Sequence, residues 1–276
     1  MENENASLII KLKFRDKSFE VIADLKFDRL RKGISFIWNK DCRIQNLSHQ
    51  TVNLKWRYAG ELEPPFRKVS NIIEVTSEVE FSELCLEYKG SVNDAWYNVI
   101  SRDVKALSWY SVWFPQNLPF RLIYDEVNIE NGESLVVVKG DYDANQKKWK
   151  YGGKGFDPFN IIAYKKTSLF CISNEGINIY ALDQQIALQA DRVGKVYQDI
   201  LHFFNGNLFP QKVVQPLDIA STYPAIKFGG GYQREGLLFC DKLGESDEQI
   251  TWLLAHETAH NWCQGADVNT FEELVK

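Results

Sequence analysis

The hydrophobic pattern of this chain changes its period once, and the change divides the sequence into two parts. Before residue 140, apolar and polar residues alternate in short runs, which is the period of half-buried strands. From residue 183 onward, apolar residues recur every three to four positions, which is the period of a helix. The alternating runs are 8–14, 51–58, 84–88 and 135–138. The sequence therefore predicts an α+β protein whose strands come first and whose helices come later.

The first part is expected to fold as an antiparallel β domain, either a sandwich or a saddle. It sustains no helical period, and turn residues at Pro64-Pro65, Lys89-Gly90 and Asn131-Gly132 separate its runs. A length of 276 residues suits one large domain or two moderate ones. The glycine-rich segment 151–158 is the best boundary, which predicts domains at 1–155 and 156–276.

The second part is predicted to alternate helices with short strands. A long amphipathic helix is expected over 183–204, closed by Asn205-Gly206. Short strands follow at 217–220, 225–228 and 237–240. The last helix is expected to begin at Ser246, with the form of a capping box, and its apolar face contains Ile250, Leu253 and Leu254, widened by Trp252 and Ala255.

A His-Glu-x-x-His motif lies on this last helix, at His256, Glu257 and His260. Residues four apart share one face of a helix, so both imidazoles can reach one metal ion. Imidazole nitrogen is a zinc ligand, and a catalytic zinc takes three protein ligands and an open position for water. Glu257 stands where the general base of a metal-dependent hydrolase belongs. The motif predicts one Zn²⁺ ion at His256 and His260, in an apolar surround, with Glu257 as the catalytic residue.

Two other interpretations of the motif compete with a zinc-hydrolase site. The histidines could be only packed or solvated on a β-rich protein with an accidental motif, but two of the four histidines in the chain occupy this spacing around a Glu. Zincins with a different third ligand would need Gly at 263 and His or Asp at 266, where this chain has Cys263 and Ala266. That second alternative fails. Cys263 itself is either a soft extra ligand or a small hydrophobic residue behind the helix.

Composition excludes several partners. The net charge is −5 and no basic run occurs, so nucleic acid is not an expected partner. No run approaches the length of a membrane span and no secretory signal begins the chain, so a membrane is not expected either. The five cysteines are odd in number and lack CxxC spacing, which is typical of reduced thiols in the cytoplasm. The oligomeric state is left open.

A glycine-rich stretch at 229–236 precedes the last predicted strand. It lacks the Gly-Lys-Ser/Thr ending of a phosphate loop. Glycines on an edge strand allow another backbone to approach, and a peptide that adds itself as a strand would use such a surface. The alternative is a flexible turn between two strands. The predicted substrate-binding residues are Gly229, Gly230, Gly231, Tyr232 and Gln233.

Together these motifs resemble the aminopeptidase N family of gluzincin zinc peptidases. The resemblance covers most of the chain in order: 109–115, Phe203-Phe204, 208–210, the glycine-rich strand, and the zinc motif followed by Asn261-Trp262. It implies a saddle-shaped first domain and then the first part of a thermolysin-like catalytic domain. It also implies a zinc-dependent, aminopeptidase-type hydrolase that cuts peptides, with Glu257 as general base.

The chain departs from that family at two points. The family Glu that binds the free amino group of a substrate corresponds to Gln233, whose amide offers no charge. The family Glu that completes the zinc site, and the Tyr that stabilises the oxyanion, correspond to positions beyond Lys276. The resemblance therefore implies an incomplete and inactive portion of a peptidase, with zinc absent or partially occupied. The alternative is a catalytically inactive peptide-binding or regulatory module.

Overall fold

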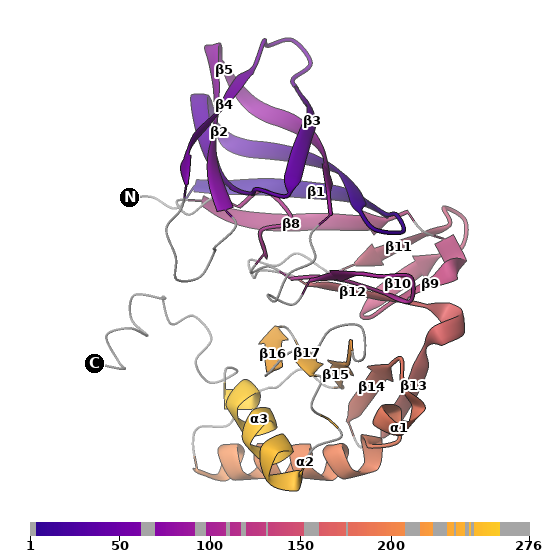
Figure 1. The fold of residues 1–276 in the computed structure, drawn as a ribbon. Coiled ribbons are helices and arrows are strands. Elements are labelled where there is room, and N and C mark those ends of the chain that lie inside the picture. Colours follow the sequence, from indigo (N-terminus) through magenta and orange to yellow (C-terminus); the bar gives the residue numbers. More distant parts are fainter. Residues whose placement is uncertain are drawn as a thin grey trace. The chain divides into compact units, whose positions relative to one another are not determined.

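The computed structural model describes residues 4–61, 70–91, 98–108, 111–116, 120–130, 132–151, 160–174, 176–207, 216–222, 231–234, 236–240, 243 and 246–259. Most of these residues lie in strands and few in helices, so the chain is of the mixed α+β class. Packing divides it into two compact units, 1–168 and 169–276 (Figure 1). The domain boundary predicted from the sequence, between residues 155 and 156, lies outside the described residues.

The first unit contains a large sheet with strand order β10-β11-β8-β1-β2-β5-β3, and β4 pairs with β5 beside it. Neighbouring strands are antiparallel except β1 and β8, which are parallel. The strands are β1 (Glu4–Phe14), β2 (Phe19–Asn39), β3 (Cys42–Ser48), β4 (Lys55–Glu61), β5 (Ser70–Gly90), β8 (Phe120–Ile129), β10 (Gly140–Asp143) and β11 (Lys148–Tyr151).

A smaller antiparallel sheet in the same unit has strand order β6-β7-β12-β9. Its strands are β6 (Val99–Ile100), β7 (Val104–Leu107), β9 (Leu135–Val137) and β12 (Ile161–Lys165). Two 3-10 helices, η2 (Gly132–Ser134) and η3 (Lys166–Ser168), flank β9 and β12. The predicted strand at 84–88 lies within β5, and the one at 135–138 corresponds to β9, which ends one residue earlier.

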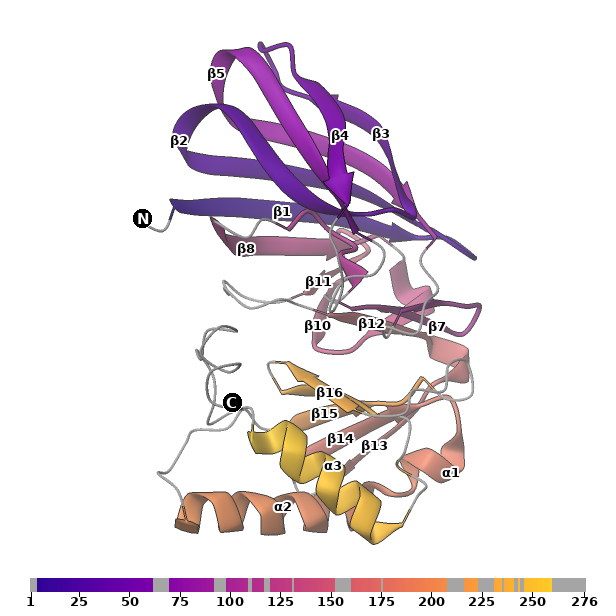
Figure 2. The same cartoon turned by 60° about the vertical axis from the view of Figure 1, so that its left-hand side comes forward.

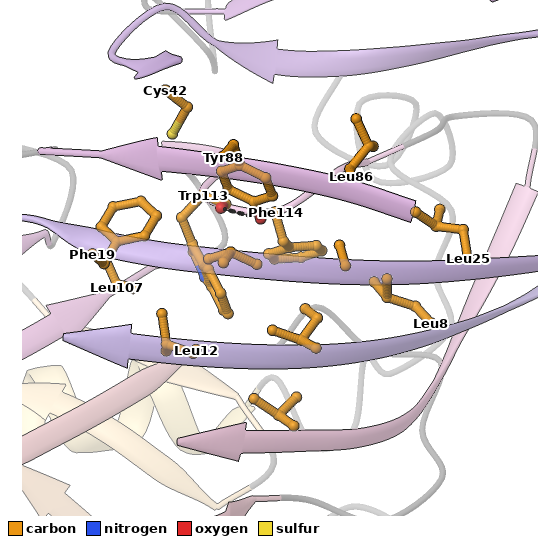
Figure 3. Packing of buried hydrophobic residues seen from close by; sticks show 14 of the residues in the cluster. Leu8, Leu12, Phe19, Leu25, Cys42, Leu86, Tyr88, Leu107, Trp113 and Phe114 are labelled. Carbon is orange, nitrogen blue, oxygen red and sulfur yellow. Dashed lines mark hydrogen bonds between the residues drawn. The ribbon is translucent and has the colours of Figure 1, made fainter. Parts of the chain in front are cut away.

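The core of the first unit is built on the alternation that the sequence shows in β1. Every second residue of β1 from Ala6 to Phe14 is buried, with at most 3% of its surface exposed. Aromatic side chains of the same buried cluster pack over this row of β1 residues (Figure 3). Trp113 meets Phe19 edge to face, with ring centroids 6.5 Å apart. Trp38 meets Tyr88 in the same way at 4.7 Å.

The predicted strand at 51–58 is wrong in its first half and in its burial. Residues 51–54 are not in a strand, β4 begins at Lys55, and all seven residues of β4 are exposed. Trp56 lies across from the buried Val75 of β5, yet 39% of its own surface is exposed. Alternation predicts which residues share a face, but only the tertiary structure decides whether that face is covered.

The second unit contains a sheet with strand order β13-β14-β15-β17-β16. β14, β15 and β17 run parallel, and β13 and β16 pair antiparallel at the two ends. The strands are β13 (Phe170–Asn174), β14 (Ile177–Ala181), β15 (Leu217–Ala220), β16 (Gly231–Arg234) and β17 (Leu237–Cys240). The predicted strands at 217–220 and 237–240 are confirmed, and 225–228 lies outside the described residues.

Helices cover one face of this sheet (Figure 2). They are α1 (Gln184–Ala187), α2 (Ala190–Asn207) and α3 (Asp247–Ala259). Parallel strands need a crossover connection, and α2 lies in the connection from β14 to β15. Across the described part of the chain, no helix is long and apolar enough to cross a membrane.

The single helix predicted over 183–204 is broken in two. Asp183 caps α1 by accepting a hydrogen bond from the Gln185 amide at 2.8 Å, and α1 ends after one turn. Leu188, at the break, is 52% exposed. Ile186 and Ala190, on either side of the break, are both buried. The buried residues therefore keep their four-residue spacing although the helix is interrupted. The α2 helix also extends to Asn207, past the predicted end, and the side-chain amide of Asn207 donates to the carbonyl oxygen of Phe203 at 2.8 Å.

Candidate functional site

The helix that carries the zinc motif forms where the sequence predicts it. The Gln249 amide donates to the Ser246 hydroxyl at 3.4 Å, and the Ile250 amide donates to the Ser246 carbonyl at 3.1 Å. The Ser246 hydroxyl in turn donates to the side-chain oxygen of Gln249 at 3.4 Å. Asp247 and Glu248 lie in the first turn, where their negative charges interact favourably with the positive end of the helix dipole. Local sequence therefore defines the start of α3.

One side of α3 is buried, and it is narrower than predicted. Ile250, Leu253 and Leu254 are each at most 3% exposed. Trp252, predicted to widen the apolar face, is instead 66% exposed. Each residue turns about 100° around a helix, so Trp252 points about 200° away from Ile250. The packed face of α3 therefore excludes its largest apolar side chain.

The motif residues divide between the two sides of α3. Glu257 is buried, with 4% of its surface exposed, beside the fully buried Thr258. His256 is exposed, so the expected apolar surround of this imidazole is wrong. The imidazole of His256 stacks on the indole of Trp252, with ring centroids 5.6 Å apart and planes inclined by 18°. His260 lies outside the described residues.

The glycine-rich stretch continues into a strand. Gly231, Tyr232 and Gln233 lie in β16, which pairs antiparallel with β17. Gly236 between the two strands has a φ of 73°, a conformation that favours glycine. Gly229 and Gly230 lie outside the described residues. Within the described sheet, β16 is the outermost strand, so one edge of its backbone faces away from β17.

Packing brings the motif helix and this strand together. The α3 helix lies against β16 and against α2 within the second unit (Figures 1 and 2). The helix with His256 and Glu257 therefore neighbours the strand with Gly231, Tyr232 and Gln233. Nothing in the sequence spacing required this contact, because residues 235–246 separate the two segments.

The described residues include only some of the side chains that a complete metal site would need. The described residues include no group of three His, Cys, Asp or Glu side chains placed to hold one metal ion. Cys263, Glu272 and Glu273, which the sequence offers near the motif, lie outside the described residues. His256 is thus the one predicted ligand whose position the structure describes.

A polar cluster that sequence reasoning missed occupies three strands of the same sheet. The Asn178 amide donates to the Asp218 carboxylate at 2.8 Å, and Cys171 pairs in register with Tyr180. Burial, reinforced by the Asp218 charge, raises the pKa of Tyr180 and that of the Cys171 thiol. The polar residues of β14 alternate with Ile177 and Ile179, which is a visible signal. Their partners on β13 and β15 come only from strand pairing.

Comparison of the chain with protein-family models finds no match, and comparison with curated proteins finds none either. The resemblance to the aminopeptidase N family therefore stays a prediction that rests on the motifs. Of the segment 109–115, the structure describes 111–115, where Trp113 and Phe114 are fully buried. Residues 208–210 and Asn261-Trp262 lie outside the described residues.

Proposed function

We propose that the second unit carries part of a zinc-dependent peptidase site, in which His256 and His260 hold one Zn²⁺ ion and Glu257 is the general base. The observation that carries this proposal is the packing of α3, which bears the motif, against the outermost strand β16. A hydrolytic motif thus lies beside a backbone edge that can bind an extended peptide. At the level of fold, the first unit is proposed as a saddle and the second as the first part of a thermolysin-like lobe.

The imidazole of His256 is a suitable zinc ligand. Imidazole is among the preferred zinc ligands, and the imidazole of His256 is accessible on the exposed side of α3. Residue 260 follows it by four positions, the spacing that places two side chains on one helix face. The chemistry that a bound zinc ion supplies is polarisation of a carbonyl and acidification of a water molecule. A third ligand is still required for a complete catalytic site.

Glu257 is proposed as the base because it directly follows the first proposed ligand, His256, in the motif. The residue is buried, with 4% of its surface exposed, whereas His256 is exposed. In the proposed reaction, Glu257 accepts a proton from the attacking water and returns it to the leaving amine. The β16 strand holds the peptide by backbone hydrogen bonds, which explains the use of glycine at 231.

A second candidate function is a cytoplasmic module that binds peptides without cutting them. The amide of Gln233 favours it, because an amide accepts a hydrogen bond from a peptide amino terminus without the charge of a carboxylate. The two candidates differ in whether Glu257 performs a proton transfer. They agree that the ligand is a peptide.

Zinc binding to the full 276-residue chain tests the metal site. We expect weak, reversible binding in competition with a chromophoric chelator, because two imidazoles supply less coordination energy than three ligands. His256→Gln should weaken binding by about tenfold or more, since it removes one of the two proposed ligands. The matched control is His202→Gln, an exposed histidine on α2, which should leave the affinity unchanged. Equal affinities for the wild type and His256→Gln would contradict the proposal.

Glu257→Gln separates the two candidate functions. A peptidase assay and a peptide-binding assay are run on the chain, and on the chain extended through any reading frame that follows residue 276. The peptidase proposal expects cleavage by a zinc-loaded form that Glu257→Gln abolishes, while peptide binding remains. Binding without cleavage by every zinc-loaded form would favour the binding module instead.

A further inference from the structure

Trp252 and His256 form a stacked ring contact on the surface of α3. The two residues are four apart, so they share one face of α3, and their rings are stacked within the separation range of aromatic pairs. Both side chains are exposed, and Trp252 has 66% of its surface in solvent. A large apolar ring is thus kept on the surface at the position that covers the first histidine of the motif.

The geometry of the stack leaves the imidazole able to bind a metal. The indole covers one face of the imidazole ring, whereas both ring nitrogens present their lone pair or hydrogen at the edge, in the ring plane. Exposed side chains otherwise exchange among staggered rotamers. Contact with Trp252 restricts His256 to the rotamers in which the rings overlap, which lowers the entropic cost of binding.

Charge decides whether the stacked contact raises or lowers the affinity of His256 for a metal ion. An imidazole bound to Zn²⁺ shares the positive charge of the ion, and the face of an indole ring is electronegative. The stacked contact is therefore stronger when the metal is bound than when it is absent. By thermodynamic linkage, a contact that strengthens on binding raises the affinity for the metal.

We propose that Trp252 is a positioning residue for His256, which holds the imidazole by stacking and raises the affinity of the site for a divalent metal ion. This inference rests on the proposed function, because it takes His256 as a ligand. Trp252 itself touches neither metal nor substrate in this proposal.

The test compares the metal affinities of variants of the 276-residue chain. Trp252→Leu removes the aromatic face and should weaken Zn²⁺ and Cu²⁺ binding about three- to tenfold, the gain expected from restricting one side chain. Trp252→Phe keeps a stackable ring and should retain most of the affinity. The matched control is Trp56→Leu, which removes an exposed tryptophan from β4 of the first unit and should have no effect.

Two spectroscopic readouts separate positioning from a general structural role. In the NMR spectrum, the ring current of Trp252 should shift the imidazole protons of His256 upfield, and Trp252→Leu should abolish the shift. Cu²⁺ quenches nearby indole fluorescence, so quenching in the wild type should exceed that in the Trp252→Phe and His256→Gln variants. Circular dichroism should show α3 intact in all variants, because Trp252 is exposed.

The outcomes distinguish this inference from the proposed function. If His256→Gln loses metal binding while Trp252→Leu binds as tightly as the wild type, the inference fails and the proposed site stands. Tighter binding by Trp252→Leu, or an equal loss in the Phe and Leu variants, also overturns it. If the wild type does not bind, or His256→Gln leaves binding unchanged, both the proposed site and the inference fail.

Discussion

The hydroxyl of Tyr88 donates a hydrogen bond to the carbonyl oxygen of Trp113 at 3.0 Å, and both residues are buried (Figure 3). This hydrogen bond links the segment that contains Trp113 to β5 in the core of the first unit. Tyr88→Phe should lower the free energy of unfolding by about 1–3 kcal/mol, because it leaves a buried carbonyl without its donor. Chemical denaturation measures the loss. Tyr58→Phe on the exposed β4 is the control, and an equal loss there would contradict the prediction.

The same tyrosine predicts a dependence on alkaline pH. Burial, and to a lesser extent Cys42, raises the pKa of Tyr88 well above its ordinary value of 10.0. The unfolded chain therefore releases this proton at a lower pH than the folded chain does. Stability from Tyr88 is complete below about pH 10 and is lost as the pH rises toward the folded pKa. The stability difference between the wild type and Tyr88→Phe should shrink above about pH 10, and a constant difference would contradict this.

Gly90, at the end of β5, has no room for a side chain. A Cβ atom there would lie 2.3 Å from Cζ of Phe19 and 2.9 Å from Sγ of Cys42. Gly90→Ala should therefore destabilise the protein by about 1–3 kcal/mol, the usual cost of overpacking a core. Gly60→Ala on β4 is the matched control, since nothing lies within 4 Å of its added Cβ. Thermal unfolding of the two variants checks the prediction, which fails if they melt together.

Lys105 joins two hairpins of the first unit. Its ammonium group donates to the carbonyl oxygens of Arg15 at 3.0 Å and Asp16 at 3.1 Å, and to that of Ser101. Lys105→Met keeps the length of the side chain and removes the donors, so we expect a loss of about 1–3 kcal/mol in unfolding free energy. Lys26→Met, at an exposed position of β2, should change it little. A small effect at both positions would show that solvent satisfies these carbonyls.

Much of the local structure could be predicted from the sequence. Alternation in β1 predicted its buried row, because a strand has only two faces and one of them forms the core. The capping residues predicted where α3 begins, and helical spacing predicted its buried residues Ile250, Leu253 and Leu254. The same spacing failed between Ile186 and Ala190, where two helices bury neighbouring side chains and the chain between them is not helical. Parallel pairing of β1 with β8 joins segments more than a hundred residues apart, and no local pattern specifies it.

The sequence by itself determined the residue types of the candidate site and the angles between them on one helix. It predicted Ile250, Leu253 and Leu254 on the packed face of α3, but it could not determine how wide that face is, because the width depends on packing against α2 and β16. The tertiary structure buried Glu257 and exposed His256, and it placed Trp252 in solvent against the imidazole. It also set β16 beside α3. Helical periodicity is a property of neighbours in the chain, whereas burial and strand edges come from contacts between distant segments.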